Sequence, residues 1–192
     1  MDSLLKRTAA WFKLLGIDGF DPVLSKSKRW IEWVTTFTPN TCMDCAQQHG
    51  KIFDRNDPPE EEPPLHPNCH CYLRILLAIL AGTATFDGLQ GADYTIKQYG
   101  RLPDNYVTQE TADAKGWRSK KGNLREILEN ATIGGDIYQN KNVKLPQMNG
   151  RIWYEADINY TGGYRNRQRL LYSNDGLMFV TYDHYETFYE II

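Results

Sequence analysis

The stretch RIWYEADINYTGGYRNRQR, residues 151–169, decides the fold of the larger part of this chain. Its first half alternates as a strand would, with Trp153, Glu155 and Asp157 on one face and apolar or aromatic residues on the other. A Thr-Gly-Gly turn signal follows, and then three arginines stand at alternate positions: Arg165, Arg167 and Arg169. We therefore predict a hairpin in which the carboxylate strand lies beside the arginine strand. A carboxylate that faces guanidinium groups on a sheet is a candidate site for handling phosphate.

The residues around this hairpin predict an α+β domain over residues 84–192. Helix-capping residues and helical spacing come first, and period-two alternation with glycine-rich turns takes over from Thr132. Helices followed by strands indicate an antiparallel sheet of about five strands with its helices at the N-terminal side. The predicted helices and strands lie near residues 87–99, 108–116, 123–130, 132–138, 151–160, 167–173, 176–183 and 187–192.

The N-terminal part has a different texture. Apolar residues spaced by three and four, including Trp30, Trp33 and Phe37, predict a helical segment over residues 1–38. Residues 39–72 hold all four cysteines of the chain, and we interpret residues 73–83 as a linker.

The cysteines form two pairs, Cys42-x-x-Cys45 and Cys69-x-Cys71, separated by the proline-rich acidic run RNDPPEEEPPLHP. Paired thiols around such a loop are typical of a knuckle that closes on structural zinc. The predicted ligands are the four cysteines, with His66 or His49 as the alternative to one thiol of the tighter Cys69-x-Cys71 pair. Disulfides, a redox-active pair and unmodified buried thiols are the competing interpretations, and the missing secretory signal disfavours disulfides.

Charge and hydropathy restrict the partners. The 192 residues carry 22 Lys and Arg against 24 Asp and Glu, a net charge of −2, so a nucleic acid would be met by a local cationic patch. The apolar run ILLAILA is too short to cross a bilayer, and no membrane partner is expected. The N-terminus resembles no signal peptide, which predicts a cytoplasmic protein or export by a route other than Sec.

Two resemblances emerge from these motifs. The strings TCMDC, HGK and HPNCHC, at residues 41–45, 49–51 and 66–71, resemble the Mu F-like phage minor head proteins, which implies a small structural or delivery module. The strings LPDNYVT, SKKGNL, IGGDIYQN, GRIWYEADINYTGGYRN and DHYETF resemble the barnase-like microbial ribonucleases over about residues 84–192.

The second resemblance implies a metal-independent, guanyl-preferring endoribonuclease that cuts single-stranded RNA through a 2′,3′-cyclic phosphate. It assigns the general base to Glu155 and the general acid to His184, and phosphate binding to Arg165 and Arg169. Arg167 has no counterpart in the family pattern, and we interpret it as solvated.

The resemblance also implies substrate-binding residues: Asp136, which would be buried and order the arginines, Tyr185, and the loop Tyr138, Gln139, Asn140, Lys141 and Asn142. Two of the family's residues are replaced. Gln109 stands where the family has a lysine, and Asn142 stands where it has the carboxylate that binds guanine. Asparagine offers one acceptor oxygen and no charge, so guanine preference should weaken.

The family further implies a toxin neutralised by a small acidic barstar-like inhibitor that would face Lys141, Arg165, Arg169 and His184. The alternative is a phage-type structural or delivery protein whose attenuated nuclease domain only binds RNA. A zinc-bearing RNA-binding module is a third interpretation.

Overall fold

The computed structural model describes residues 22–192. The helix expected before residue 22 lies outside them. The elements in chain order are β1 (Leu24–Thr35), α2 (Met43–Gln48), β2 (Ile52–Asp54), β3 (Cys71–Ile79), η1 (Gly88–Gln90), α3 (Ala92–Tyr99), β4 (Tyr106–Val107), α4 (Gln109–Ala114), η2 (Ser119–Lys121), α5 (Leu124–Ile127), β5 (Thr132–Tyr138), β6 (Trp153–Asp157), β7 (Arg169–Ser173), β8 (Met178–Thr181) and β9 (Tyr189–Ile191).

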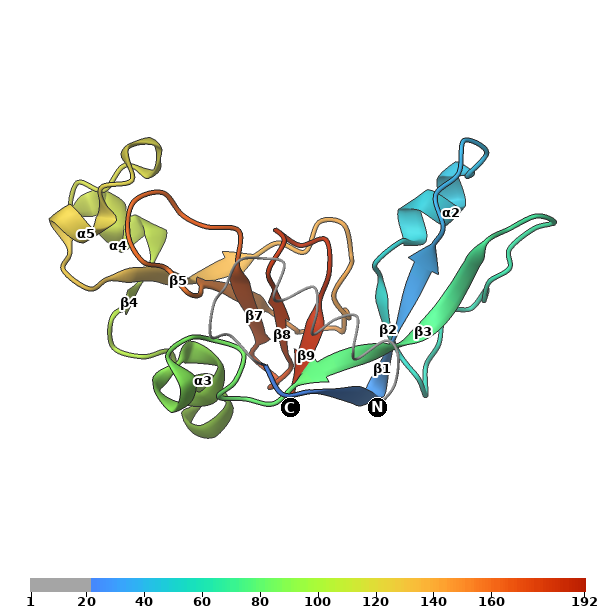
Figure 1. The fold of residues 1–192 in the computed structure, drawn as a ribbon, viewed down its shortest axis with the longest axis horizontal. Coiled ribbons are helices and arrows are strands. Elements are labelled where there is room, and N and C mark those ends of the chain that lie inside the picture. The colour runs from blue at the N-terminus through green and yellow to red at the C-terminus, as the bar shows by residue number, and fades with distance from the viewer. Residues whose placement is uncertain (1–21) are drawn as a thin grey trace.

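One mixed sheet of nine strands runs through these residues in the order β2-β1-β3-β9-β8-β7-β6-β5-β4 (Figure 1). The strands β5 to β9 pair antiparallel with one another, which confirms the predicted meander, but the whole sheet is larger than the five strands expected. The α+β prediction holds, with little helix. Two further pairs, β3 with β9 and β4 with β5, are parallel.

The predicted helix over residues 1–38 is wrong from Leu24 to Thr35, because these residues form β1. Both faces of this strand are covered: Trp30 belongs to one buried cluster and Trp33, which points to the opposite face, belongs to another. Burial on both faces removes the period of two from the sequence. The strand also has an irregularity, since the pairing with β3 shifts between Lys26 and Ile31 and the Ser27 hydroxyl accepts the N–H of Trp30 (2.8 Å). Its aromatic and β-branched residues favour a strand.

The predicted linker over residues 73–83 is also wrong as far as Ile79. These residues belong to β3, where Ala78 and Ile79 are fully buried. The strand β3 pairs with β1 on one side and β9 on the other, so the N-terminal segment extends the sheet of the C-terminal region (Figure 1). No flexible connection separates the two at this point.

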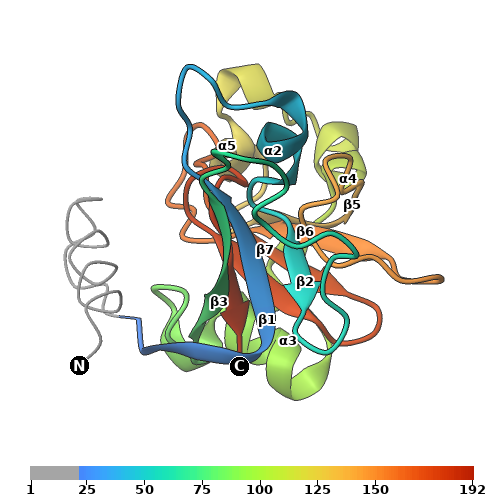
Figure 2. The same ribbon diagram turned by 90° about the vertical axis from the view of Figure 1, so that its right-hand side faces the viewer.

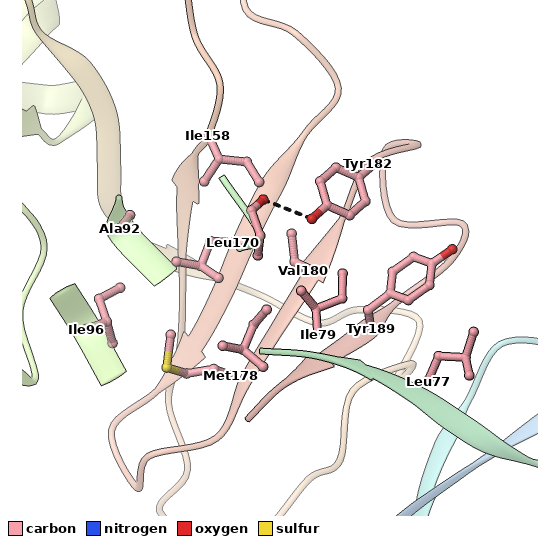
Figure 3. Packing of buried hydrophobic residues seen from close by; sticks show 12 residues of the cluster. Leu77, Ile79, Ala92, Ile96, Ile158, Leu170, Met178, Val180, Tyr182 and Tyr189 are labelled. Carbon is pink, nitrogen blue, oxygen red and sulfur yellow. Dashed lines mark hydrogen bonds between the residues drawn. The ribbon is translucent and has the colours of Figure 1, made fainter. Parts of the chain in front are cut away.

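Two buried clusters lie on opposite faces of this sheet, because neighbouring strand residues point to opposite sides. The first includes Leu77, Leu170 and Val180 together with Ala92 and Ile96 of α3 (Figure 3). There the Tyr182 hydroxyl donates to the Ala84 carbonyl (2.9 Å). The second cluster consists of Trp30, Ile52, Leu76, Leu145, Trp153, Leu171, Phe179 and Phe188.

Two helix boundaries are as the sequence predicts, whereas α3 begins only at Ala92, α5 ends already at Ile127, and Asp87 and Asn123 make no side-chain capping bond. Gly100 takes the left-handed conformation (φ 70°) at the C-terminus of α3, and the Thr108 side chain accepts the N–H of Thr111 at the start of α4. Within residues 22–192, none of the helices has the length and apolar character needed to cross a bilayer.

Candidate active site

The hairpin predicted from residues 151–169 is present, but its second strand begins only at Arg169, so Arg165 and Arg167 lie in the connection between the strands. Strands β6 and β7 pair antiparallel, with Glu155 opposite Leu171 and Asp157 opposite Arg169. Gly162 (φ 114°) and Gly163 (φ 71°) have the positive φ that the turn signal predicts. The carboxylate strand and the end of the arginine segment are therefore neighbours in the sheet.

Asp157 organises both arginines. Its side chain is 1% exposed and accepts two hydrogen bonds of 2.7 Å from the Nε and Nη2 of Arg165. The Nε of Arg169, which is also buried, lies 3.0 Å from the same carboxylate. Burial acts to lower the pKa of Arg165. The hydrogen bonds to Asp157 and the charge of that carboxylate outweigh burial, so the pKa of Arg165 is raised. The Arg165 guanidinium is thus charged, and contacts with Asp157 fix the direction of both guanidinium groups.

Glu155 lies next to this pair. One oxygen, Oε1, is 3.9 Å from the Nη2 of Arg165, and the other, Oε2, accepts a hydrogen bond from the Tyr185 hydroxyl (2.6 Å). Burial raises the pKa of Tyr185, and the hydrogen bond to Glu155 raises it further. Tyr185 therefore stays a donor to this carboxylate.

His184 lies on the loop between β8 and β9, directly before Tyr185. Its side chain is exposed, and its ring centroid is 4.8 Å from that of Tyr185. Both residues have positive φ, 66° and 69°. Asp183 holds the loop in this strained form, since its carboxylate accepts from the Thr181 hydroxyl (2.9 Å) and the Thr187 N–H (2.9 Å). The loop thereby brings Tyr185, the residue directly after His184, into contact with Glu155.

The comparisons with known proteins agree with this geometry. Residues 89–192, more than half of the chain, match the family model of the ribonucleases. The chain belongs to the ribonuclease family. Two relatives carry the same description: the ribonuclease of Bacillus intermedius is 53% identical over 112 residues, 58% of this chain and 67% of the relative. The ribonuclease of Heyndrickxia coagulans is 53% identical over 107 residues, 56% of this chain and 95% of the relative.

A second match covers the other part. Residues 24–74 match the family described as Phage Mu protein F like protein, which confirms the resemblance of the cysteine-containing segment. Membership of the ribonuclease family implies RNA as the substrate, and it covers the region that carries Glu155 and His184. The Mu F-like match covers β1, α2 and β2 and the first residues of β3.

The predicted base-recognition loop of the ribonuclease follows β5. Tyr138 is half-buried and stacks on Tyr185, with ring centroids 5.2 Å apart. Burial, together with the charge of Glu155, raises the pKa of Tyr138 to about 12. Asn140 is buried, and its amide donates to the Leu145 carbonyl (2.8 Å) and accepts the Leu145 N–H (3.1 Å). The side chain of Asn140 therefore closes the loop, while Gln139, Lys141 and Asn142 are exposed along it.

Asp136 does not have the place that the resemblance implies. It is half-buried, and its carboxylate accepts the N–H of Gln109 (3.0 and 3.2 Å) at the start of α4. The residue that orders the arginines is Asp157, which sequence reasoning did not select. The alternation of the sequence already indicates this position, because Asp157 lies two residues after Glu155 and therefore on the same face of the strand.

The predicted metal ligands also lie together. The ligand atoms of Cys42, Cys45 and His66 are within 4.8 Å of one another, and so are those of Cys45, Cys69 and Cys71. All four cysteines of the chain are within residues 22–192 and are free thiols. The alternative ligand His49 lies elsewhere, because its Nδ1 accepts the N–H of Thr35 (3.0 Å).

Proposed function

We propose that the ribonuclease region cuts single-stranded RNA endonucleolytically in two steps. In the first step Glu155 takes the proton of a ribose 2′-hydroxyl, whose oxygen attacks the neighbouring phosphorus. The bond to the 5′ oxygen breaks, His184 protonates that oxygen, and a 2′,3′-cyclic phosphate remains. In the second step His184 takes a proton from water as it attacks the cyclic phosphate, and Glu155 protonates the departing 2′ oxygen. Each such proton transfer contributes about 10²–10⁴-fold in rate.

The 2.6 Å hydrogen bond from Tyr185 to Glu155 carries this proposal. It joins the proposed base to the loop that bears the proposed acid. On its other side the same carboxylate is 3.9 Å from Arg165, whose guanidinium is held by Asp157. A phosphate that displaced the Arg165–Glu155 contact would meet Arg165 and Arg169 and lie next to Glu155. Fixed cations in this position stabilise charge that develops on phosphate oxygens.

The proposed chemistry requires an ionised Glu155 and a protonated His184 at the same time, so kcat/KM should be bell-shaped in pH. It uses side chains alone, and we therefore expect full activity in the presence of EDTA. For guanine, the loop of residues 138–142 would supply Tyr138 as a stacking surface and backbone groups as hydrogen-bonding partners. The Asn142→Glu variant should sharpen the preference for guanine. An unchanged cleavage pattern would show that Asn142 takes no part in base recognition.

The decisive experiment measures cleavage of a short guanosine-containing RNA by Glu155→Ala and His184→Ala. Each variant should lose about 10²–10⁴-fold in kcat. The matched control is Arg167→Ala, because Arg167 is exposed and on the same segment as Arg165, and only its backbone carbonyl contacts the His184 N–H. If Glu155→Ala or His184→Ala cleaves at the wild-type rate, its acid–base assignment is wrong.

We also propose that the ribonuclease is a toxin held by a small acidic barstar-like inhibitor. Lys141, Arg165, Arg169 and His184 would present the cationic surface that such a protein complements. Coexpression with the neighbouring open reading frame should suppress lethality, and a Glu155→Ala chain should be harmless without it. Lethality that survives in Glu155→Ala would separate toxicity from cleavage.

The alternative is a phage-type structural or delivery protein that binds RNA without cutting it. The Mu F-like match and the replacement of the family lysine by Gln109 favour this reading. The two are distinguished by one digestion: RNA binding without product in wild-type protein would support the alternative.

A further inference from the structure

The far end of the Mu F-like segment gathers thiols and one imidazole at a place that the ribonuclease reaction does not use. Cys42 and Cys45 flank the start of α2, and His66 and Cys69 end the loop that leads into β3 (Figures 1 and 2). The Nε2 of His66 is 3.2 Å from the Sγ of Cys42 and 3.4 Å from that of Cys45. The Sγ atoms of Cys45 and Cys69 are 3.6 Å apart.

These separations are close to those around one tetrahedral zinc ion. Bond lengths of about 2.3 Å for Zn–S and about 2.0–2.1 Å for Zn–N correspond to about 3.8 Å between two sulfurs and about 3.6 Å between sulfur and nitrogen. The thiol of Cys45 is common to both groups of ligand atoms. A bound ion would need only to draw Cys42 and His66 toward Cys69.

The tautomer of His66 fits a ligand. Its Nδ1 lies 3.0 Å from the carbonyl oxygen of Pro67, which can only accept, so Nδ1 carries the proton. The other ring nitrogen, Nε2, faces the thiols of Cys42 and Cys45. A histidine that binds a metal commonly donates its second ring N–H to a backbone carbonyl in this way.

Cys71 is the thiol with a second hydrogen-bonding partner. The Thr35 hydroxyl donates to the Cys45 carbonyl (2.7 Å), and the Cys71 thiol donates to the oxygen of the same hydroxyl (3.5 Å). Its Sγ lies within 4.8 Å of those of Cys45 and Cys69, but it is not in the group that holds Cys42 and His66.

We propose that Cys42, Cys45, His66 and Cys69 form a structural Zn²⁺ site, with Cys71 as an unligated thiol. Three thiols would release their protons to solvent as the Zn–S bonds form. The packing shows what such a cross-link would add. Among residues 22–192, the buried cluster at this end consists of Trp33, Cys45 and Cys71, and α2 has six residues. A metal would tie α2 to the end of the loop of residues 55–70.

The test uses the full chain purified under reducing conditions. Elemental analysis should give about one zinc per chain, and replacement by Co²⁺ should give the intense visible absorption of a tetrahedral thiolate site. Thermal unfolding should shift to lower temperature after chelation. No metal in the wild-type protein, together with no tetrahedral spectrum on titration with Co²⁺, would overturn the proposal without any variant.

The ligand assignment is tested by matched substitutions. Cys69→Ser and His66→Gln should each lose zinc at least tenfold, whereas Cys71→Ser, which keeps a donor for Thr35, should retain it. Loss in Cys71→Ser with retention in His66→Gln would instead assign the site to four cysteines. Circular dichroism of each variant in excess Co²⁺ separates a lost ligand from a lost fold.

Discussion

The Mu F-like segment and the ribonuclease region share one sheet but relate differently to their sequences. In the ribonuclease region the strands alternate with a period of two, and Glu155, Arg165 and Arg169 come together as the residues indicate. In the Mu F-like segment the motifs identify the family, yet its longest strand carries a helical spacing, because Trp30 and Trp33 are buried on opposite faces of the strand. A motif can thus identify a family while the conformation of the residues around it depends on partners far away in the chain.

The two regions are also joined through a common core. Trp30 of β1 packs on Phe179 of β8, with ring centroids 5.8 Å apart, in a cluster that includes Leu145 and Trp153. The backbone N–H of Ile52 donates to the Lys144 carbonyl (2.8 Å), in the loop that follows the proposed base reader. The Mu F-like segment therefore packs directly against the ribonuclease region next to this loop.

The largest expected effect is that of Trp30→Ala on stability. Trp30 is 2% exposed, and its removal should lower the free energy of unfolding by about 3–5 kcal/mol, from lost burial and the cavity left behind. If the regions form one unit, fluorescence and RNase activity should be lost in a single transition in urea. Phe37→Ala, at an aromatic that is 60% exposed on the same segment, is the control and should cost little. Two separate transitions in wild-type protein would contradict the common core.

Asp157→Asn should have the next largest effect, confined to the ribonuclease region. The substitution keeps the shape of the side chain but leaves the buried guanidinium of Arg169 without a counter-charge, a loss of about 3–5 kcal/mol for a broken buried pair. Activity should fall as well, since Arg165 loses its bidentate partner. Asp104→Asn removes an exposed pair with Arg101 and should cost less than about 1 kcal/mol. Equal losses in the two variants would mean that Asp157 is not the residue that orders the arginines.

The sequence predicted what local pattern determines. Alternation, turn glycines and the Thr108 cap were sufficient for the meander and its hairpin, and the cysteine spacing was sufficient for the thiol cluster. The parallel pairing of β3 with β9 was not accessible, because it joins residues about 110 positions apart through backbone hydrogen bonds that leave no local spacing. The burial of Asp157 was not accessible for a similar reason, because it depends on the strands on both sides, although its place on the face of Glu155 could be read from the alternation.

Asn140→Ala should have a smaller effect on stability. It changes the loop through which the ribonuclease region contacts the Mu F-like segment. The Asn140 amide makes two hydrogen bonds to the backbone of Leu145, and its loss should cost about 1–3 kcal/mol by leaving buried groups unsatisfied. Because the base-reading loop would loosen, KM for a guanosine-containing RNA should rise more than kcat falls. Asn149→Ala, at an exposed position farther along the same loop, should change neither. An unchanged KM in Asn140→Ala would separate the loop from base recognition.

Val143→Gly should have the smallest effect and the opposite sign. Val143 has φ 51°, a left-handed conformation that is strained for a β-branched residue, and its side chain is exposed. Glycine removes about 1–2 kcal/mol of strain but costs about 0.5–1 kcal/mol through the larger entropy of the unfolded chain, so a gain of up to about 1.5 kcal/mol is expected. Thermal unfolding of the variant measures it, with Val23→Gly at an exposed position outside the left-handed region as the control. If Val143→Gly is more stable and its kcat/KM is unchanged, the strain at Val143 has no role in base recognition by the loop of residues 138–142. If the variant is less stable, the valine side chain makes packing contacts that outweigh the strain.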